Sequence, residues 1–282
     1  MTGKLYKLQF REVGRIARIL IPLTFLFVIA TSASALLRIG FLTGIMMFLT
    51  ILMIVGSAFV LFFLVISNDY HNMQGKRAYF VRSIPAEPKQ LFTSRFLYYL
   101  SFFLLTIAAL LLQVFLLVIL MTAAEGSSVS DMLETIRYLL RSAGIGFILA
   151  TVGYGLFALV MNSLVFMFVI SVGSEAPLRH FGIGGPVLVY IIYYVVMQVV
   201  SFVGLFAIPI GVRFNAAAPT PNQANFELVA ESTLPQFIRM VQDGTEPTQP
   251  VIGLGIIPLY IILAIVVGIL TYRSMSKRLT LN

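Results

Sequence analysis

Residue types that carry enzyme chemistry are scarce in this chain. It has no cysteine and only two histidines, His71 and His180, so thiol catalysis, disulfides and thiolate metal sites are excluded and a histidine metal site is not expected. A GxxxxGK[ST] phosphate loop is missing, because Gly75-Lys76 is followed by Arg77 and lacks the upstream glycine. The HExxH and GxSxG motifs are missing as well. We therefore expect no catalytic site, no metal and no bound cofactor in this chain.

Polar side chains inside the long apolar stretches are the remaining candidates for function. Buried amides in a helix bundle usually join helices, and Gln113, Asn162 and Gln198 are amides of this kind. The alternative is a translocation pathway or a subunit interface formed by Asn162 and Gln198 with Tyr190 and Tyr194. No Asp or Glu lies in these stretches, so a buried carboxylate proton relay has no candidate, whereas sodium coupling through backbone carbonyls stays open.

The elements that position these residues follow from composition. Of 282 residues, 59% are hydrophobic and 11% charged, and the mean hydropathy is +0.98. A bilayer core needs about 20 apolar residues in a helix, because lipid cannot satisfy exposed backbone groups. Six stretches meet this length: Ile19 to Leu37, Ile39 to Asn68, Phe96 to Ala124, Ser142 to Ser174, His180 to Val212 and Pro247 to Tyr272. We predict an all-α polytopic membrane protein with a transmembrane domain over 19–272 and a basic tail over 273–282. The basic N-terminus is expected to be retained rather than cleaved.

The orientation follows from lysine and arginine. With the N-terminus in the cytoplasm, only five basic residues of nineteen fall outside: Arg38, Arg137, Arg141, Arg213 and Arg239. Cytoplasmic segments of membrane proteins carry this excess of positive charge. Both termini are therefore expected in the cytoplasm. The net charge of +8 is assigned to topology and anionic headgroups rather than to nucleic acid.

A basic amphipathic helix is predicted over 1–18. At 100° per residue its cations fall within a stripe roughly 80° wide: Lys4, Lys7, Arg11, Arg15 and Arg18. Such a helix lies in the membrane interface with its apolar side in acyl chains. Pro22 is where the chain is expected to turn from lying flat to crossing, and a merely topogenic basic segment is the alternative.

Three loops are expected to hold structure. In the cytoplasmic loop 68–95, Pro88 suits the first turn of a helix with Glu87 at its positive end, and its charges and aromatics suit docking as well as a simple connector. In the outer loop 213–250 a helical segment is expected from Phe226 to Val241, broken near Pro235. A helix is also expected between Glu125 and Arg141. Gly182, Gly184, Gly185 and Pro186 are expected to form a hinge or helix breaker at the start of the fifth span.

The loop and the overall plan resemble the ABC-2 type permeases, the membrane subunits of type V ABC transporters. The resemblance is carried by Asn68-Asp69, Gly75, Tyr79-Phe80, Ser83-Ile84-Pro85 and Lys89-Gln90-Leu91, together with the basic ending from Tyr272 to Leu279. It covers the whole chain in architecture and about 25 residues in motif.

The resemblance implies a separate cytoplasmic ATPase that binds ATP and magnesium, and a second permease chain, identical or related, in a bacterial plasma membrane. The ATPase would dock on the coupling loop at Arg82, Ile84, Pro85, Lys89, Gln90, Leu91 and Arg95. Export of an amphipathic substrate, such as a drug, a lipid or an antimicrobial peptide, is the direction it implies. An ATP-independent transporter and a non-transport scaffold or sensor subunit are the alternatives.

Overall fold

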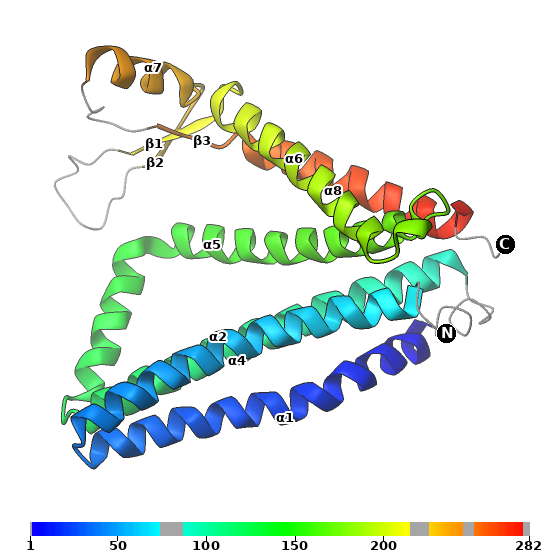
Figure 1. The fold of residues 1–282 in the computed structure, drawn as a ribbon. Coiled ribbons are helices and arrows are strands. Elements are labelled where there is room, and N and C mark those ends of the chain that lie inside the picture. The colour runs from blue at the N-terminus through cyan, green and yellow to red at the C-terminus, as the bar shows by residue number, and fades with distance from the viewer. Residues whose placement is uncertain (1, 74–86, 215–225, 245–250, 279–282) are drawn as a thin grey trace. The chain divides into compact units, whose positions relative to one another are not determined.

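The computed structural model describes residues 2–73, 87–214, 226–244 and 251–278 and is built almost entirely of helices (Figure 1). Six helical segments are long and apolar enough to cross a membrane. They are α1 (Thr2–Leu36), α2 (Gly40–Met73), α4 (Pro88–Ala124), the Gly144–Gly173 part of α5 (Val129–Gly173), α6 (Gly184–Phe206) and the segment Ile256–Ser276 that contains α8 (Ile256–Arg273). The predicted polytopic helical membrane protein with six spans is confirmed at this level.

The chain forms two compact units, each described by itself. The first comprises Met1–Arg137 and Phe157–Ile170, and the second comprises Tyr138–Leu156 and Ser171–Asn282. In the first unit α1, α2 and α4 pack along one another, with the start of α1, the end of α2 and the start of α4 at the same end (Figure 1). Its core is aromatic at that end, where Phe10 of α1 lies on Phe102 of α4 with ring centroids 4.5 Å apart.

Helix α1 differs from the expected interfacial helix followed by a turn at Pro22. Residues 2–36 form one helix with Pro22 inside it. Its apolar side packs on protein: Val13 and Ala17 are buried in the core shared with α2 and α4, and the Tyr6 hydroxyl donates to Ser101 Oγ at 3.0 Å. A proline inside a helix costs about 3 kcal/mol, and the packing of α1 against two neighbouring helices on both sides of Pro22 offsets that cost.

Polar contacts join the spans in the apolar middle of the first unit. Gln113 Nε2 of α4 donates to Thr24 Oγ1 of α1 at 2.6 Å, and both side chains are buried. The hydroxyls of Thr31 and Thr50 are 2.6 Å apart and link α1 to α2. Gln113 therefore joins two helices, as the structural interpretation of the buried amides predicted.

Helix α5 contains a break that separates the segment expected between Glu125 and Arg141 from the fourth span. At Gly144 the backbone has φ 77° and ψ 149°, which is not helical. A side chain rarely adopts a positive φ, so glycine suits this position. The helix expected in the loop is confirmed as the start of α5, and Asp131 lies in its first turn.

In the second unit, close backbone packing joins the helices. After a 3-10 turn, Arg179–Phe181, α6 begins at Gly184, which confirms the interruption expected from Gly182 to Pro186. A Cβ on Gly185 would lie only 2.4 Å from the carbonyl oxygen of Gly173. A Cβ on Gly204 of α6 would lie 2.6 Å from the Cα of Ile256 of α8. Both contacts require glycine, as at the small-residue crossings of membrane helices.

The outer loop was predicted as helical and is partly a sheet. Strands β1 (Gly211–Phe214), β2 (Phe226–Val229) and β3 (Val251–Gly253) form an antiparallel sheet in the order β2-β1-β3. The helical prediction from Phe226 was wrong for its first part, because β1 supplies a pairing partner for this short segment. It was correct further on, where α7 (Leu234–Asp243) has Pro235 in its first turn.

The sheet is fastened to α7 by side-chain hydrogen bonds. Thr233 Oγ1 accepts from the Gly253 amide at 2.9 Å, and Gln236 Oε1 accepts from the Val251 amide at 2.8 Å. After α8 the chain continues as a π-helical turn, Ser274–Arg278, with the Met275 side chain buried. The described part of the predicted tail is therefore helical.

Candidate functional site at the paired ends of α2 and α4

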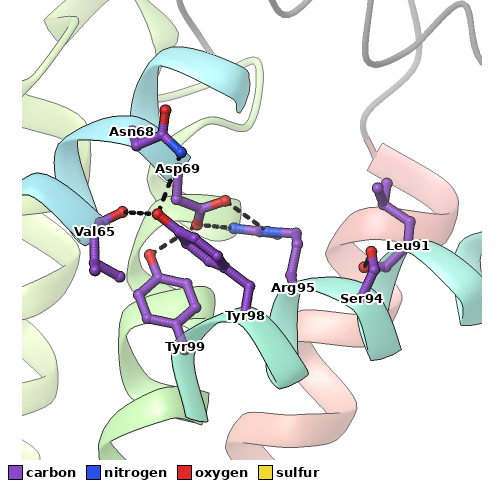
Figure 2. Close-up of polar contacts among 8 residues, drawn as sticks. All are labelled: Val65, Asn68, Asp69, Leu91, Ser94, Arg95, Tyr98 and Tyr99. Atoms are coloured by element: carbon purple, nitrogen blue, oxygen red, sulfur yellow. Dashed lines mark hydrogen bonds and ion pairs between the residues drawn. The ribbon is translucent and has the colours of Figure 1, made fainter. Parts of the chain in front are cut away.

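A buried ion pair joins the last turn of α2 to the second turn of α4 (Figure 2). Arg95 donates from Nε to Asp69 Oδ1 at 2.9 Å and from Nη2 to Asp69 Oδ2 at 2.5 Å. Asp69 is 1% exposed and Arg95 is 0% exposed. Two parallel N–H bonds to one carboxylate give a fixed geometry as well as charge neutralisation. The pair therefore holds these two helix ends at one spacing and one angle.

Two tyrosines of α4 complete the network. The Tyr99 hydroxyl donates to Asp69 Oδ2 at 2.9 Å, so this oxygen accepts from both Arg95 and Tyr99. The Tyr98 hydroxyl accepts from Asn68 Nδ2 at 3.2 Å and donates to the Val65 carbonyl at 3.4 Å (Figure 2). Both tyrosine side chains are fully buried. Every polar atom named here has a partner, as a buried polar cluster requires.

The same spacing on both helices brings these groups together. Val65, Asn68 and Asp69 stand at i, i+3 and i+4 on α2, and Arg95, Tyr98 and Tyr99 repeat that spacing on α4. Residues three and four apart share a helix face, so two polar faces meet across the contact between α2 and α4. Sequence reasoning missed this cluster, because it ended the second span at Asn68 and placed Asp69 in the loop.

The structure corrects two statements made from the sequence. Helix α2 continues to Met73, so a carboxylate, Asp69, does lie within a span-forming helix. Arg95 was predicted to dock an ATPase, yet its guanidinium is buried and bound to Asp69. Its physical role within this chain is to neutralise that carboxylate. Leaving either charge buried without its partner costs several kcal/mol, about 3 to 5 by comparison with other buried pairs.

Of the other residues predicted to dock an ATPase, three are described by the structure and three are not. Helix α4 begins at Pro88 with Glu87 as its N-cap, which confirms the predicted start. The Lys89 side chain is exposed, while Gln90 and Leu91 are half-buried and Leu91 packs against the aromatic core. Arg82, Ile84 and Pro85 lie outside the described residues. Docking by these six residues stays a prediction.

The five basic residues predicted on one stripe of α1 are all exposed: Lys4, Lys7, Arg11, Arg15 and Arg18. The residues buried on the opposite side repeat every four positions: Leu5, Gln9, Val13 and Ala17. The stripe is therefore real, and the side opposite to it contacts α2 and α4 rather than acyl chains.

The four residues predicted for a pathway or a subunit interface are divided between the two units. Asn162, in the first unit, donates from Nδ2 to the Ala158 carbonyl at 2.8 Å and lines an apolar pocket of about 350 Å³ with Phe59, Phe62 and Phe103. Tyr190, Tyr194 and Gln198, in the second unit, are exposed and recur every four residues on one face of α6. A role of these four residues in a pathway or a subunit interface stays a prediction.

Among the residues that the structure describes, no group of three or more His, Asp or Glu side chains could hold a metal ion. Comparison with protein-family models, with curated proteins and with solved structures yields no match. A functional conclusion for this chain therefore rests on its own residues and on their geometry.

Proposed function

We propose that this chain is the membrane subunit of an ATP-binding-cassette exporter of the ABC-2 type, driven by a separate ATPase. The observation that carries the proposal is the segment between α2 and α4. Its motif residues resemble the ABC-2 coupling loop, and the helix ends on both sides of it are tied by the buried Asp69–Arg95 pair. The two helix ends that flank this segment are thereby held together.

This anchoring suits energy coupling. A movement of the loop is passed on to both flanking helices only if the ends of these helices move together. Because Asp69 and Arg95 share two hydrogen bonds in a water-excluded site, α2 and α4 respond to the loop as one body. Nucleotide-driven closure of the ATPases would then move these helices together and shift the transporter between inward-facing and outward-facing states.

In this proposal, one subunit binds ATP and this chain forms the translocation pathway. The 282 residues contain no phosphate loop, so ATP and magnesium would be bound by a cytoplasmic partner. The distribution of basic residues supports a cytoplasmic position for the N-terminus, the segment 68–95 and the C-terminal segment in the cell membrane. A second permease chain, identical or related, would complete the pathway. The substrate class we propose is amphipathic, because the described spans present apolar and tyrosine side chains and few charges.

Co-purification tests the proposal. The chain is solubilised mildly with its associated proteins, which are then identified by mass spectrometry. A stoichiometric phosphate-loop ATPase is the expected partner, and it should be lost in the double variant Arg82→Glu/Lys89→Glu. The matched control is Arg137→Glu/Arg141→Glu, which makes the same charge change on the opposite predicted side and should retain the ATPase. A chain that purifies alone and moves substrate in liposomes without nucleotide would be an ATP-independent transporter, and the proposal would be wrong.

A further inference from the structure

A second polar feature of the first unit lies on its surface, between α1 and α2. A cleft of about 1030 Å³ is walled by one face of each helix. The lining residues from α1 stand at positions 8, 11, 12, 13, 15 and 16, and those from α2 at positions 64, 67, 68, 70 and 71. Apart from Val13 and Tyr70, both sets follow the spacing of a single helix face, so the cleft is a groove between the two helices.

The charge of this cleft is positive. Arg11 and Arg15 stand one turn apart on α1, and both side chains are exposed. Neither guanidinium forms an ion pair or side-chain hydrogen bond with another residue in the described part of the chain. Glu12 contributes the single carboxylate among the lining residues and is half-buried, whereas both arginines are exposed. The accessible part of the cleft therefore presents two cations to an incoming anion.

Further hydrogen-bonding groups line the wall on α2. His71 Nδ1 lies 2.7 Å from the Ser67 carbonyl, so this nitrogen carries the proton and donates it within the helix. The opposite nitrogen, Nε2, is left as the one that can contact a ligand. The hydroxyl of Ser67 and the amide of Asn68 lie on the same wall. The cleft thus combines two arginine cations with the hydrogen-bonding groups of Ser67, Asn68 and His71, which suit a phosphate bearing a polyol.

The ends of the cleft differ in polarity. Helices α1 and α2 are antiparallel neighbours, since Thr31 contacts Thr50 across a tight connection, and Ile16 and Leu64 accordingly lie nearer the apolar stretches than Arg11 and His71 do. Ile16 is 42% exposed although it lies beside the arginines. A site with two arginines, and with the exposed Ile16 and the half-buried Leu64 on its side toward the apolar stretches, matches a molecule with an anionic head and an apolar tail.

We infer that this cleft binds an anionic phospholipid, with the phosphate at Arg11 and Arg15, the polar headgroup against Ser67 and His71, and an acyl chain against Ile16 and Leu64. The inference depends on the chain being embedded in a membrane and not on the proposed export function. Binding at this position would fix α1 to α2 beside the Asp69–Arg95 pair. It also assigns a specific role to two of the five cations of the α1 stripe.

Fluorescence quenching by brominated lipids tests the inference, because the chain contains no tryptophan. An Ile16→Trp reporter is placed in the cleft of the full-length chain in nanodiscs, and a Leu26→Trp reporter on the same helix, 60% exposed before substitution, serves outside it. Dibrominated phosphatidylglycerol is compared with dibrominated phosphatidylcholine at equal mole fraction. We expect the apparent affinity at Ile16→Trp to favour phosphatidylglycerol about fivefold or more, and Leu26→Trp to show no preference.

Two charge variants separate a defined site from general attraction. Arg11→Gln/Arg15→Gln should abolish the preference at Ile16→Trp. The control Lys4→Gln/Lys7→Gln removes the same charge from exposed positions of the same helix outside the cleft and should keep it. Equal quenching by the two lipids, or an equal loss in both charge variants, would overturn the inference. Complete loss of the preference when inorganic phosphate replaces chloride at matched ionic strength would make the occupant a free anion and would overturn the lipid assignment.

Discussion

Asp69 and Arg95 are separated by 26 positions in the chain, yet they share two hydrogen bonds in a site from which solvent is excluded. From the sequence, both residues were predicted to lie in the loop 68–95, next to the ends of two hydrophobic stretches. In the structure each belongs to a helix and neutralises the other. The pair, with Tyr99 as a third partner, is the strongest polar contact between α2 and α4 that the described residues provide.

Removing one charge of the pair should destabilise the protein more than removing both. Asp69→Asn leaves the Arg95 guanidinium buried beside a neutral amide, and we expect a loss of about 3 to 5 kcal/mol. The double variant Asp69→Leu/Arg95→Met should recover part of that loss, because neither charge is then buried. The stability of both variants is measured by thermal unfolding in detergent, with the folded fraction determined by size-exclusion chromatography. The exposed pair Arg213–Glu231, 2.8 Å apart, offers the control, since Glu231→Gln should cost no more than about 1 kcal/mol.

The two tyrosines of the cluster should differ in importance. Tyr99→Phe removes a hydrogen bond to a buried carboxylate and should cost about 1.5 to 3 kcal/mol. Tyr98→Phe removes longer bonds to an amide and a carbonyl, at 3.2 and 3.4 Å, and should cost about 1 kcal/mol. Both variants keep the ring, so packing is matched. The same unfolding assay ranks them, and an effect of Tyr98→Phe as large as that of Tyr99→Phe would contradict the assigned network.

Glycine should be required at position 185 and replaceable at position 268. Gly185→Ala places a methyl group 2.4 Å from the Gly173 carbonyl oxygen, and relieving that contact should cost about 1 to 3 kcal/mol. Gly268 lies inside α8 with no atom within 4 Å of a Cβ, so Gly268→Ala should be neutral or stabilise the helix by up to about 1 kcal/mol. Melting temperatures of the two variants check this. Equal tolerance at both positions would show that the close packing of Gly173 and Gly185 does not occur.

The predicted topology can be read directly from labelling, because the chain has no cysteine of its own. Ser128→Cys, at an exposed position between α4 and α5, should react in intact cells with a maleimide that does not cross the membrane. Lys89→Cys, exposed at the start of α4, should react only after the cells are opened. The reverse pattern would place the loop between α2 and α4 outside the cell and would remove the basis for ATPase docking there.

The sequence was informative wherever one physical requirement dominated. Continuous apolar length predicted the six spans, and Pro88 with Glu87 predicted the start of α4. The prediction failed where a partner distant in the chain decided the outcome. Asp69 stays within a helix because Arg95 neutralises it, and Pro22 stays within α1 because its neighbours pack on α2 and α4.

The short strands were missed for a similar reason. The segment from Phe226 to Val229 is four residues long, and its sequence does not predict a strand; pairing with β1 makes it one. One signal for the buried cluster was nevertheless present in the sequence. Asn68-Asp69 and the Arg95, Tyr98, Tyr99 set follow matching helical spacings on opposite sides of one loop, with opposite charges. A search for such complementary polar faces at span ends would have found it.

The small sheet also has a mechanical consequence for the second unit. Strand β1 follows α6 and strand β3 precedes α8, and the two strands are paired in register from Gly211 with Gly253 to Arg213 with Val251. The Leu254 amide adds a bond to the Ile210 carbonyl at 2.7 Å. This end of the helix pair is therefore joined by backbone hydrogen bonds, and Gly204 packs closely against Ile256. We expect relative motion of α6 and α8 to be smallest beside the sheet and largest at the opposite ends of the two helices, Gly184 and Arg273.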